Sequence, residues 1–237
     1  MRKNFDTKED FRDFYEDTAS TYDKDRSLDF EGRRVDALQR KFLNRHLGLK
    51  KGDKVIECGC GTGRMLLPLA AKGLKCYGMD TSKNMLNILK KKAKRNNLNV
   101  TTKQCDIEKI KFPDNTFDGV FSIHVLMHMQ KIDGAIKEMV RIAKPGSKIV
   151  FDLPNHDSLW TKLSLALNPK MKRTSLYRIS TIRKKLKGFN YKLDGLFSYA
   201  RTFYQIPVIR HVAAFLDTFL PLPLKCRTQV MVVITKD

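Results

Sequence analysis

Short apolar runs alternate with helix-length amphipathic stretches along the chain, and this alternation constrains the fold more than any other feature. Strand-like runs occupy 54–58, 75–80, 99–107, 117–125 and 148–154. Helix-like stretches separate them at 63–73, 82–97 and 133–146. Strands that alternate with helices at this spacing form a parallel sheet with right-handed crossovers. The sequence therefore predicts an α/β fold.

Two more strand-like runs, 191–200 and 228–236, follow the alternating region. The complete pattern predicts a Rossmann-like, seven-stranded, mostly parallel sheet with helices on both faces and a helical cap. The run 117–125 is the most continuously apolar, so we expect it near the middle of the sheet.

The length of 237 residues suits a single domain, 1–237, with a helical N-terminal segment at 1–50 and cap elements at 155–225. The chain has five cysteines and no C-x-x-C pair, which argues against a disulfide framework and favours a reducing, cytoplasmic compartment. No apolar run approaches the ~20 residues that a membrane-spanning helix needs.

The chain carries a strong positive charge of +21, from 46 basic and 25 acidic residues. This charge favours an anionic partner, such as RNA, a phosphorylated substrate or an acidic membrane surface. A solvated lysine surface accounts for the same charge without any partner. Lys170, Lys172 and Arg173 form the clearest basic group near the expected cap, where they would meet anionic head groups and place the protein at the membrane periphery.

Three glycines, Gly59, Gly61 and Gly63, directly follow the first strand. In parallel sheets, ligands bind at the carboxyl ends of the strands, and glycine lets the backbone approach a ligand closely. The pattern G-x-G-x-G differs from the dinucleotide fingerprint G-x-G-x-x-G. Glu57, two residues before the first glycine, would repel a pyrophosphate. The loop therefore favours a ligand that carries positive charge and no phosphate, and S-adenosylmethionine fits this description.

Acidic residues end the next two strands. Asp80 ends the second strand and can accept hydrogen bonds from both ribose hydroxyls of such a ligand. Asp106 ends the third strand, where its carboxylate suits an adenine amine and the Ile107 backbone suits the ring edge. Each acid alone could equally cap the following helix. Their coincidence with the glycine loop favours a cofactor site.

The motifs "VIECGCGTGR", "YGMDTSKNML", "CDIEKIKFPDNTFDGVFSIHVLMHM" and "IAKPGSKIVF" resemble those of class I S-adenosylmethionine-dependent methyltransferases. They are most similar to the branch that contains the ubiquinone and menaquinone biosynthesis enzymes. The segment "FYEDTASTYDKDR" resembles the N-terminal helical segment of that branch. The resemblance covers roughly residues 10–155. It is specific for the cofactor and poorly specific for the acceptor.

The resemblance implies a set of cofactor-binding residues. It places the glycine loop under the methionine part, with Glu57 ordering the loop near the amino group. It also implies that Met85 packs on the adenine face, although plain core packing explains Met85 equally well. The complete implied set is Tyr22, Arg26, Glu57, Gly59, Gly61, Gly63, Asp80, Met85, Asp106, Ile107, Ser122 and Ile123.

Methyl transfer needs a general base only when the acceptor must lose a proton. His124 and His156 are the candidate catalytic bases, because each follows a strand at the ligand-binding edge. His128 resembles a histidine that packs in this branch, so we interpret it as structural. Some quinone O-methyltransferases that resemble this chain carry an acid beside that histidine within a metal site. Met127 stands there instead, so we expect no metal.

We expect methyl transfer to a small or lipid-like acceptor. An RNA methyltransferase of the wobble-uridine (tRNA) type is the first alternative, favoured by the positive charge but lacking a recognisable RNA-binding module. A non-catalytic methyltransferase-like subunit that binds a partner protein is the second. The intact glycine loop and its acids argue against that role.

Overall fold

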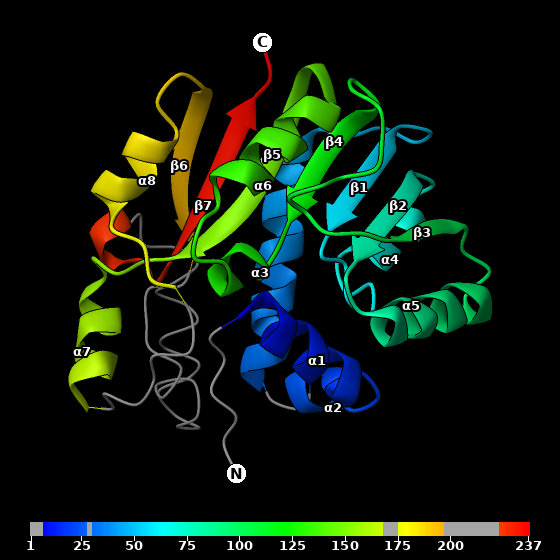
Figure 1. Cartoon of the computed structure of the whole chain (residues 1–237), viewed down its shortest axis with the longest axis horizontal. Coiled ribbons are helices and arrows are strands. Elements are labelled where there is room, and N and C mark those ends of the chain that lie inside the picture. The colour runs from blue at the N-terminus through cyan, green and yellow to red at the C-terminus, as the bar shows by residue number, and fades with distance from the viewer. Residues whose placement is uncertain (1–6, 28–29, 168–174, 197–222) are drawn as a thin grey trace.

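A computed structural model describes residues 7–27, 30–167, 175–196 and 223–237 of the chain. Its centre is one seven-stranded sheet with the order β3-β2-β1-β4-β5-β7-β6 (Figure 1). The strands are β1 (Lys54–Cys58), β2 (Lys75–Asp80), β3 (Val100–Gln104), β4 (Phe117–Ser122), β5 (Ala143–Pro154), β6 (Asn190–Leu196) and β7 (Gln229–Thr235).

The first five strands pair in parallel, and only β7 runs antiparallel to its two neighbours, β5 and β6. The predicted Rossmann-like, mostly parallel sheet is thus confirmed. β4 takes the central position, as its continuous apolar run predicted. Because the strands are parallel, the carboxyl ends of β1, β2, β3 and β4 meet at one edge.

Helices cover both faces of the sheet. Those described are α1 (Lys8–Thr18), α2 (Tyr22–Ser27), α3 (Phe30–Leu47), α4 (Leu66–Ala70), α5 (Lys83–Arg95), α6 (Asp133–Ile142), α7 (Leu159–Leu167) and α8 (Ile179–Lys185). Two short 3₁₀ turns, η1 (Leu126–His128) and η3 (Leu224–Cys226), complete the elements. In Figure 1, α1 and α2 lie beyond the arrowheads of β1 and β2.

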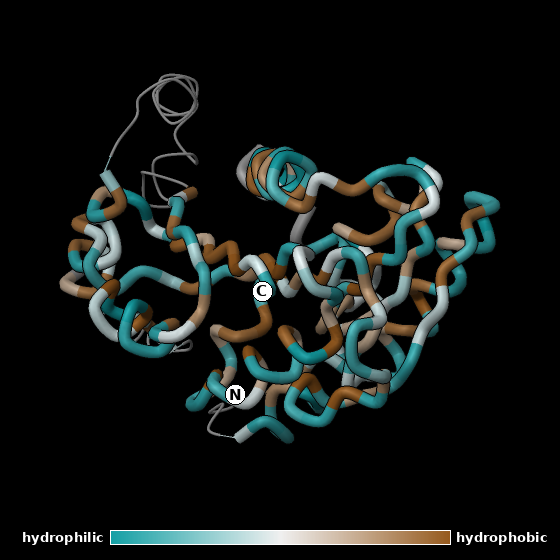
Figure 2. Tube along the Cα trace, turned by 90° about the horizontal axis from the view of Figure 1, so that it is seen from above, coloured by the Kyte–Doolittle hydropathy of each residue, from teal (hydrophilic) through white to brown (hydrophobic). Residues whose placement is uncertain are grey.

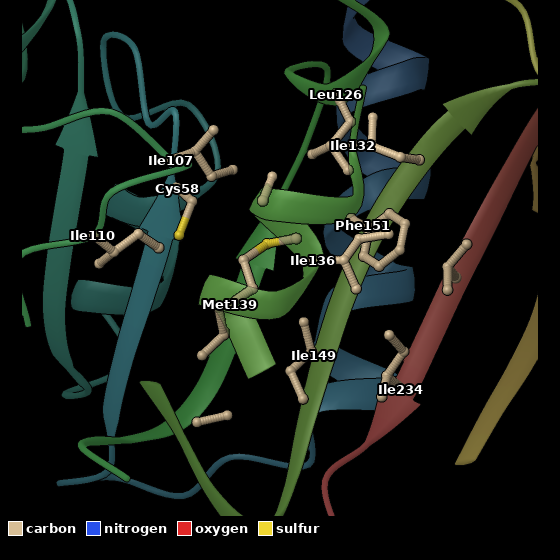
Figure 3. Close-up of a cluster of buried hydrophobic side chains, with 14 of the residues drawn as sticks. Cys58, Ile107, Ile110, Leu126, Ile132, Ile136, Met139, Ile149, Phe151 and Ile234 are labelled. Atoms are coloured by element: carbon tan, nitrogen blue, oxygen red, sulfur yellow. The ribbon is translucent and has the colours of Figure 1, made fainter. Parts of the chain in front are cut away.

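Two apolar clusters fill the space between helices and sheet. On one face, α6 and α8 pack against the strands, and Figure 3 shows Ile136 and Met139 of α6 beside Ile149 and Phe151 of β5. On the other face, α3, α4 and α5 bury side chains such as Leu43. Figure 2 shows hydrophobic stretches through the middle of the molecule. The sheet is therefore covered on both faces, which leaves its edge of strand ends for a ligand.

Several elements differ in length from the sequence prediction. The expected helix at 63–73 shortens to α4, because the loop before it holds three glycines at positive φ. The helix expected at 133–146 ends at Ile142, and β5 already begins at Ala143. The pairing register shifts between Phe117 and Gly119, where this irregular start of β5 joins the sheet.

Parts of the expected cap lie outside the described residues, including Lys170, Lys172 and Arg173 and the segment 197–222. α7 and α8 form its described part, and the cap and domain boundaries stay predictions. Within the described ranges, no helix combines the length and the apolar character that crossing a membrane requires.

Candidate active site

A cavity of about 540 Å³ lies between α1 and the carboxyl ends of the parallel strands β1, β2, β3 and β4. It brings together most of the residues that the sequence proposed for a site. These are Tyr22, Gly59, Gly61, Asp80, Met85, Asp106, Ile107, Ile123 and His124.

The three loop glycines have different structural roles. All have positive φ, which favours glycine. A Cβ on Gly59 would overlap Val125, and one on Gly63 would overlap Leu89. At Gly61 the nearest atom to such a Cβ is Met85 Sδ at 4.0 Å, so this position faces open space in the cavity. Only Gly61 therefore leaves room that a side chain would take from a ligand.

Asp80 organises the loop as well as lining the cavity. Its Oδ2 accepts the N–H of Gly61 at 2.8 Å, and its Oδ1 accepts the N–H of Ser82 at 2.9 Å. Burial raises the pKa of Asp80, while the backbone hydrogen bonds from Ser82 and Gly61 oppose this rise. Each carboxylate oxygen has a further lone pair with which it can accept a ligand hydroxyl.

Glu57, Gly63 and Ser122 do not line the cavity. Burial raises the pKa of Glu57 well above its usual range, and the nearby Arg64 opposes this effect. The Glu57 Oε2 atom has no hydrogen-bond partner among the described residues. Ser122 Oγ donates to the carbonyl of Cys58 at 2.8 Å and so ties β4 to β1. The side chain of Arg26 lies outside the described residues.

Asp106, Ile107 and Met85 also line the cavity. Asp106 lies two residues beyond β3, and its Oδ1 accepts the N–H of Glu108 at 2.9 Å. Met85 is 2% exposed, so it contributes both to the core and to the cavity wall. These positions fit the expected adenine side, and their roles stay predictions.

α1 covers the cavity, and most of its contribution was missed by the sequence analysis. Phe11 and Tyr15 line the cavity from this helix. Lys8 forms ion pairs with Asp106, at 3.5 Å, and with Glu108. Glu16 accepts from Ser82 Oγ and from the N–H of Asn84 at the start of α5. The capping box formed by Thr7 and Asp10 predicts a helix start, but nothing local indicates where the helix docks.

His128 lies in the cavity wall as a buried partner of α1. Its Nε2 is 3.0 Å from the Tyr15 hydroxyl, and its ring centroid is 4.4 Å from that of Phe11. Burial lowers the pKa of His128 to about 4, so its imidazole is neutral near pH 7. This supports the structural interpretation of His128.

The low pKa of His128 makes the fold sensitive to acid. The unfolded chain binds a proton near pH 6.5 and the folded chain only near pH 4, so stability falls as pH drops through this window. We expect His128 to account for a loss of roughly 3 kcal/mol in the free energy of unfolding, which is complete below pH 4. Chemical denaturation from pH 7 to 4 should show this component in the parent and not in His128→Gln. If the free energy of unfolding falls equally with pH in the parent and in His128→Gln, His128 is not the source of the acid sensitivity.

His124 lies in the cavity wall with a backbone φ of 62°, an uncommon value for a residue other than glycine. Its N–H donates to Asp152 Oδ1 at 2.7 Å, and its Nε2 is 2.6 Å from Gln39 Nε2. Asp152 and Gln39 are 1% and 0% exposed. The sequence analysis missed both, because single polar residues inside a strand and a helix carry no local signal.

The structure does not bring His156 to this cavity. Its N–H donates to the carbonyl of Tyr177 at 2.9 Å, and its Nδ1 is 3.7 Å from Asp157 Oδ1. Its catalytic role stays a prediction. Among the described residues, no group of three or more His, Cys, Asp or Glu side chains could hold a metal ion, and the metal-free site likewise stays a prediction.

The cavity fits the ligand that the sequence favoured. Open space at Gly61 lets a ligand approach the bare backbone, and Asp80 and Asp106 line the wall with carboxylates. Carboxylate oxygens at these positions can accept hydrogen bonds from hydroxyl and amine donors of a ligand.

Residues 56–151 match the family model described as a methyltransferase domain. The chain is 29% identical over 168 residues to the ubiquinone/menaquinone biosynthesis C-methyltransferase of Bdellovibrio bacteriovorus, covering 68% of this chain and 71% of that protein. It is 33% identical over 140 residues to the demethylmenaquinone methyltransferase of Anoxybacillus flavithermus, covering 57% and 58%. It is 30% identical over 130 residues to the sterol 4-C-methyltransferase of Caenorhabditis elegans, covering 52% and 39%.

Solved structures share the fold at low sequence identity. One is a methyltransferase from Thermotoga maritima described as a possible histamine N-methyltransferase, with a TM-score of 0.65 and 18% identity over 95% of this chain and 99% of that one. Another is the phosphoethanolamine N-methyltransferase 2 of Haemonchus contortus in complex with S-adenosyl-L-methionine, with a TM-score of 0.66 and 19% identity, covering 95% and 60%.

Proposed function

Because this chain is a class I S-adenosylmethionine-dependent methyltransferase, we propose that it methylates a small, lipid-like acceptor bound next to His124. The observation that carries this proposal is the apolar part of the cavity wall. Phe11, Tyr15, Val125 and Met129 line it together, from α1 and from the turn after β4. Apolar walls with a few placed polar groups are typical of sites for small apolar ligands.

The proposed cofactor site occupies the other part of the cavity. Gly59 and Gly61 would lie along the methionine part, Asp80 would accept from the ribose, and Asp106 and Ile107 would hold the adenine. When bound, S-adenosylmethionine supplies an activated methyl group. The chain's own contribution is alignment and exclusion of water, and α1 serves both by covering the cavity.

The names of the relatives support a lipid-like acceptor. Two of those reported act in menaquinone or ubiquinone synthesis and one on sterols, according to their names. This support is coarse, because the matched segments cover 71%, 58% and 39% of those proteins. The acceptor, its methylated atom and the membrane surface remain proposals.

An acceptor screen tests the proposal. The purified chain and radiolabelled S-adenosylmethionine would be incubated with lipid, quinol, small-metabolite and RNA fractions. We expect label in the lipid or quinol fraction. Label in RNA alone would overturn the proposal in favour of the tRNA alternative, and label in polar metabolites alone would contradict a lipid-like acceptor. No cofactor binding by calorimetry would favour the non-catalytic subunit.

Phe11→Ala should separate acceptor binding from cofactor binding. Phe11 is a half-buried apolar side chain of the cavity wall, so its loss should lower kcat/KM for the acceptor found in the screen about tenfold. Affinity for S-adenosylhomocysteine should change little. Phe14→Ala is the matched control, because Phe14 is on the same helix, is 37% exposed and does not line the cavity. Equal effects of the two variants would contradict an acceptor site at Phe11.

A further inference from the structure

We propose that Gln39, oriented by Arg64, holds neutral His124 as the tautomer that carries its proton on Nδ1. In this tautomer neutral His124 does not act as the acceptor's general base. Gln39 and Arg64 are positioning residues in this proposal. What this tautomer implies for the acceptor rests on the proposed function. The assignment of the tautomer itself rests only on the contacts of His124.

The orientation of the Gln39 amide follows from its contact with Arg64. Arg64 NH1 lies 3.0 Å from Gln39 Oε1 and 2.5 Å from Asp36 Oδ1. A guanidinium group has only donors, so the atom that Gln39 turns toward it must be the carbonyl oxygen. The amide nitrogen of Gln39 must then point the other way, and it lies 2.6 Å from His124 Nε2.

The protonation of His124 follows in turn. An amide nitrogen can only donate, so His124 Nε2 must accept from Gln39. A neutral imidazole with an accepting Nε2 carries its proton on Nδ1. The alternative, a proton on Nε2, would set two donors face to face at 2.6 Å.

Further contacts of His124 with Asp152 and Gln229 are consistent with this assignment. Asp152 Oδ1 accepts the backbone N–H of His124 at 2.7 Å, and Asp152 Oδ2 accepts from Gln229 Nε2. Asp152 Oδ2 is 3.5 Å from His124 Nε2, much farther than the Gln39 nitrogen. Gln229 Nε2, fixed as a donor by the Asp152 carboxylate, lies 3.2 Å from His124 Nε2. Two amide donors thus converge on one imidazole nitrogen.

Burial makes the arrangement specific. Gln39, Asp152 and Gln229 are 0%, 1% and 8% exposed, so bulk water does not replace a lost partner. A reversed Gln39 amide would turn its NH₂ group toward Arg64 and leave buried donors opposed. Buried polar groups that lose their partners are costly, so the network keeps one arrangement.

This tautomer narrows the class of acceptor. The lone pair of Nε2 is engaged by Gln39, and Nδ1 already carries a proton, so neutral His124 is not free to take a proton from the acceptor. We therefore expect an acceptor whose methylation does not require His124 to remove a proton.

Nitrogen-15 NMR of histidine-labelled protein tests the tautomer directly. The His124→Gln variant identifies the His124 signals among those of the five histidines. In spectra recorded at a pH where only one ring nitrogen of His124 is protonated, we expect the proton on Nδ1 and none on Nε2. A protonated Nε2 in the parent would overturn the proposal.

Variants at position 39 test the cause. In Gln39→Glu a carboxylate faces Nε2 and can only accept, so the proton should move to Nε2 and the two signals should exchange. Gln39→Met, with similar length and no polar group, should give a mixture of tautomers. A tautomer that stays on Nδ1 in both variants would overturn the role of Gln39. If neither variant folds, the parent spectrum still decides the tautomer. The NMR measurement uses no acceptor, so failure of the acceptor screen leaves its outcome intact.

Discussion

Gly61→Val is expected to fold and to lose S-adenosylhomocysteine binding by at least about 100-fold, or about 2.8 kcal/mol. The structure explains why this substitution should affect ligand binding much more than it affects packing of the core. No atom lies closer to the new Cβ than Met85 Sδ at 4.0 Å, so the core is undisturbed. The side chain instead projects into the cavity, where it would occupy the ligand's space. The positive φ adds a strain of about 1–2 kcal/mol.

Gly48→Val is the matched control for that strain. Gly48 has a φ of 62°, close to the 48° of Gly61, and an added Cβ would also meet open space. It follows α3 and does not line the cavity. Both variants should lose similar stability in denaturation, and only Gly61→Val should lose binding in calorimetry. If folded Gly61→Val still bound S-adenosylhomocysteine with the affinity of the parent, the glycine loop would not be part of the cofactor site.

Asp80→Ala is expected to weaken S-adenosylhomocysteine binding by about 1.5–3 kcal/mol, the scale for hydrogen bonds to a charged group. The substitution removes the proposed ribose partner and also leaves the N–H groups of Gly61 and Ser82 without their acceptor. Binding should also weaken in acid at a pH above the usual aspartate range, because burial raises the pKa of Asp80.

Asp118→Ala controls for the general loss of a carboxylate that accepts a backbone hydrogen bond. Asp118 accepts the N–H of Lys54 at 2.9 Å and pairs with Lys144, at the opposite edge of the sheet from the cavity. It should lower stability and leave cofactor affinity unchanged. Calorimetry on the two variants shows whether cofactor affinity falls only when Asp80 is removed or whenever a carboxylate is lost. Equal affinity of Asp80→Ala and the parent would contradict the ribose assignment.

The sequence predicts the sheet well because its signals are local. Apolar runs and amphipathic stretches mark β1 to β5 and α5 without any knowledge of tertiary contacts. The acids at the ends of β2 and β3 could be placed together for the same reason, since parallel strands end at one edge. Their positions in the cavity follow the prediction, although Asp106 lies beyond the end of β3.

What escaped prediction depends on contacts between distant segments. The Gln39, His124, Asp152 and Gln229 side chains come from α3, the loop after β4, β5 and β7. Nothing in the local sequence distinguishes them from ordinary polar positions. The pattern of three glycines likewise did not reveal that Gly63 packs against Leu89 while Gly61 faces the cavity. Docking of α1 depends on ion pairs such as Lys8 with Asp106, which span most of the first half of the chain.

The position of β7 between β5 and β6 sets an order of assembly during synthesis. β6 emerges before β7, yet in the described sheet it pairs only with β7. β1 to β5 need no later strand for their mutual pairing, so the cofactor-binding half can form while the rest of the chain is still being made. Gln229, at the start of β7, joins His124 and Asp152 only afterwards. The hydrogen-bond network around His124 can therefore be completed only after β7 has been made.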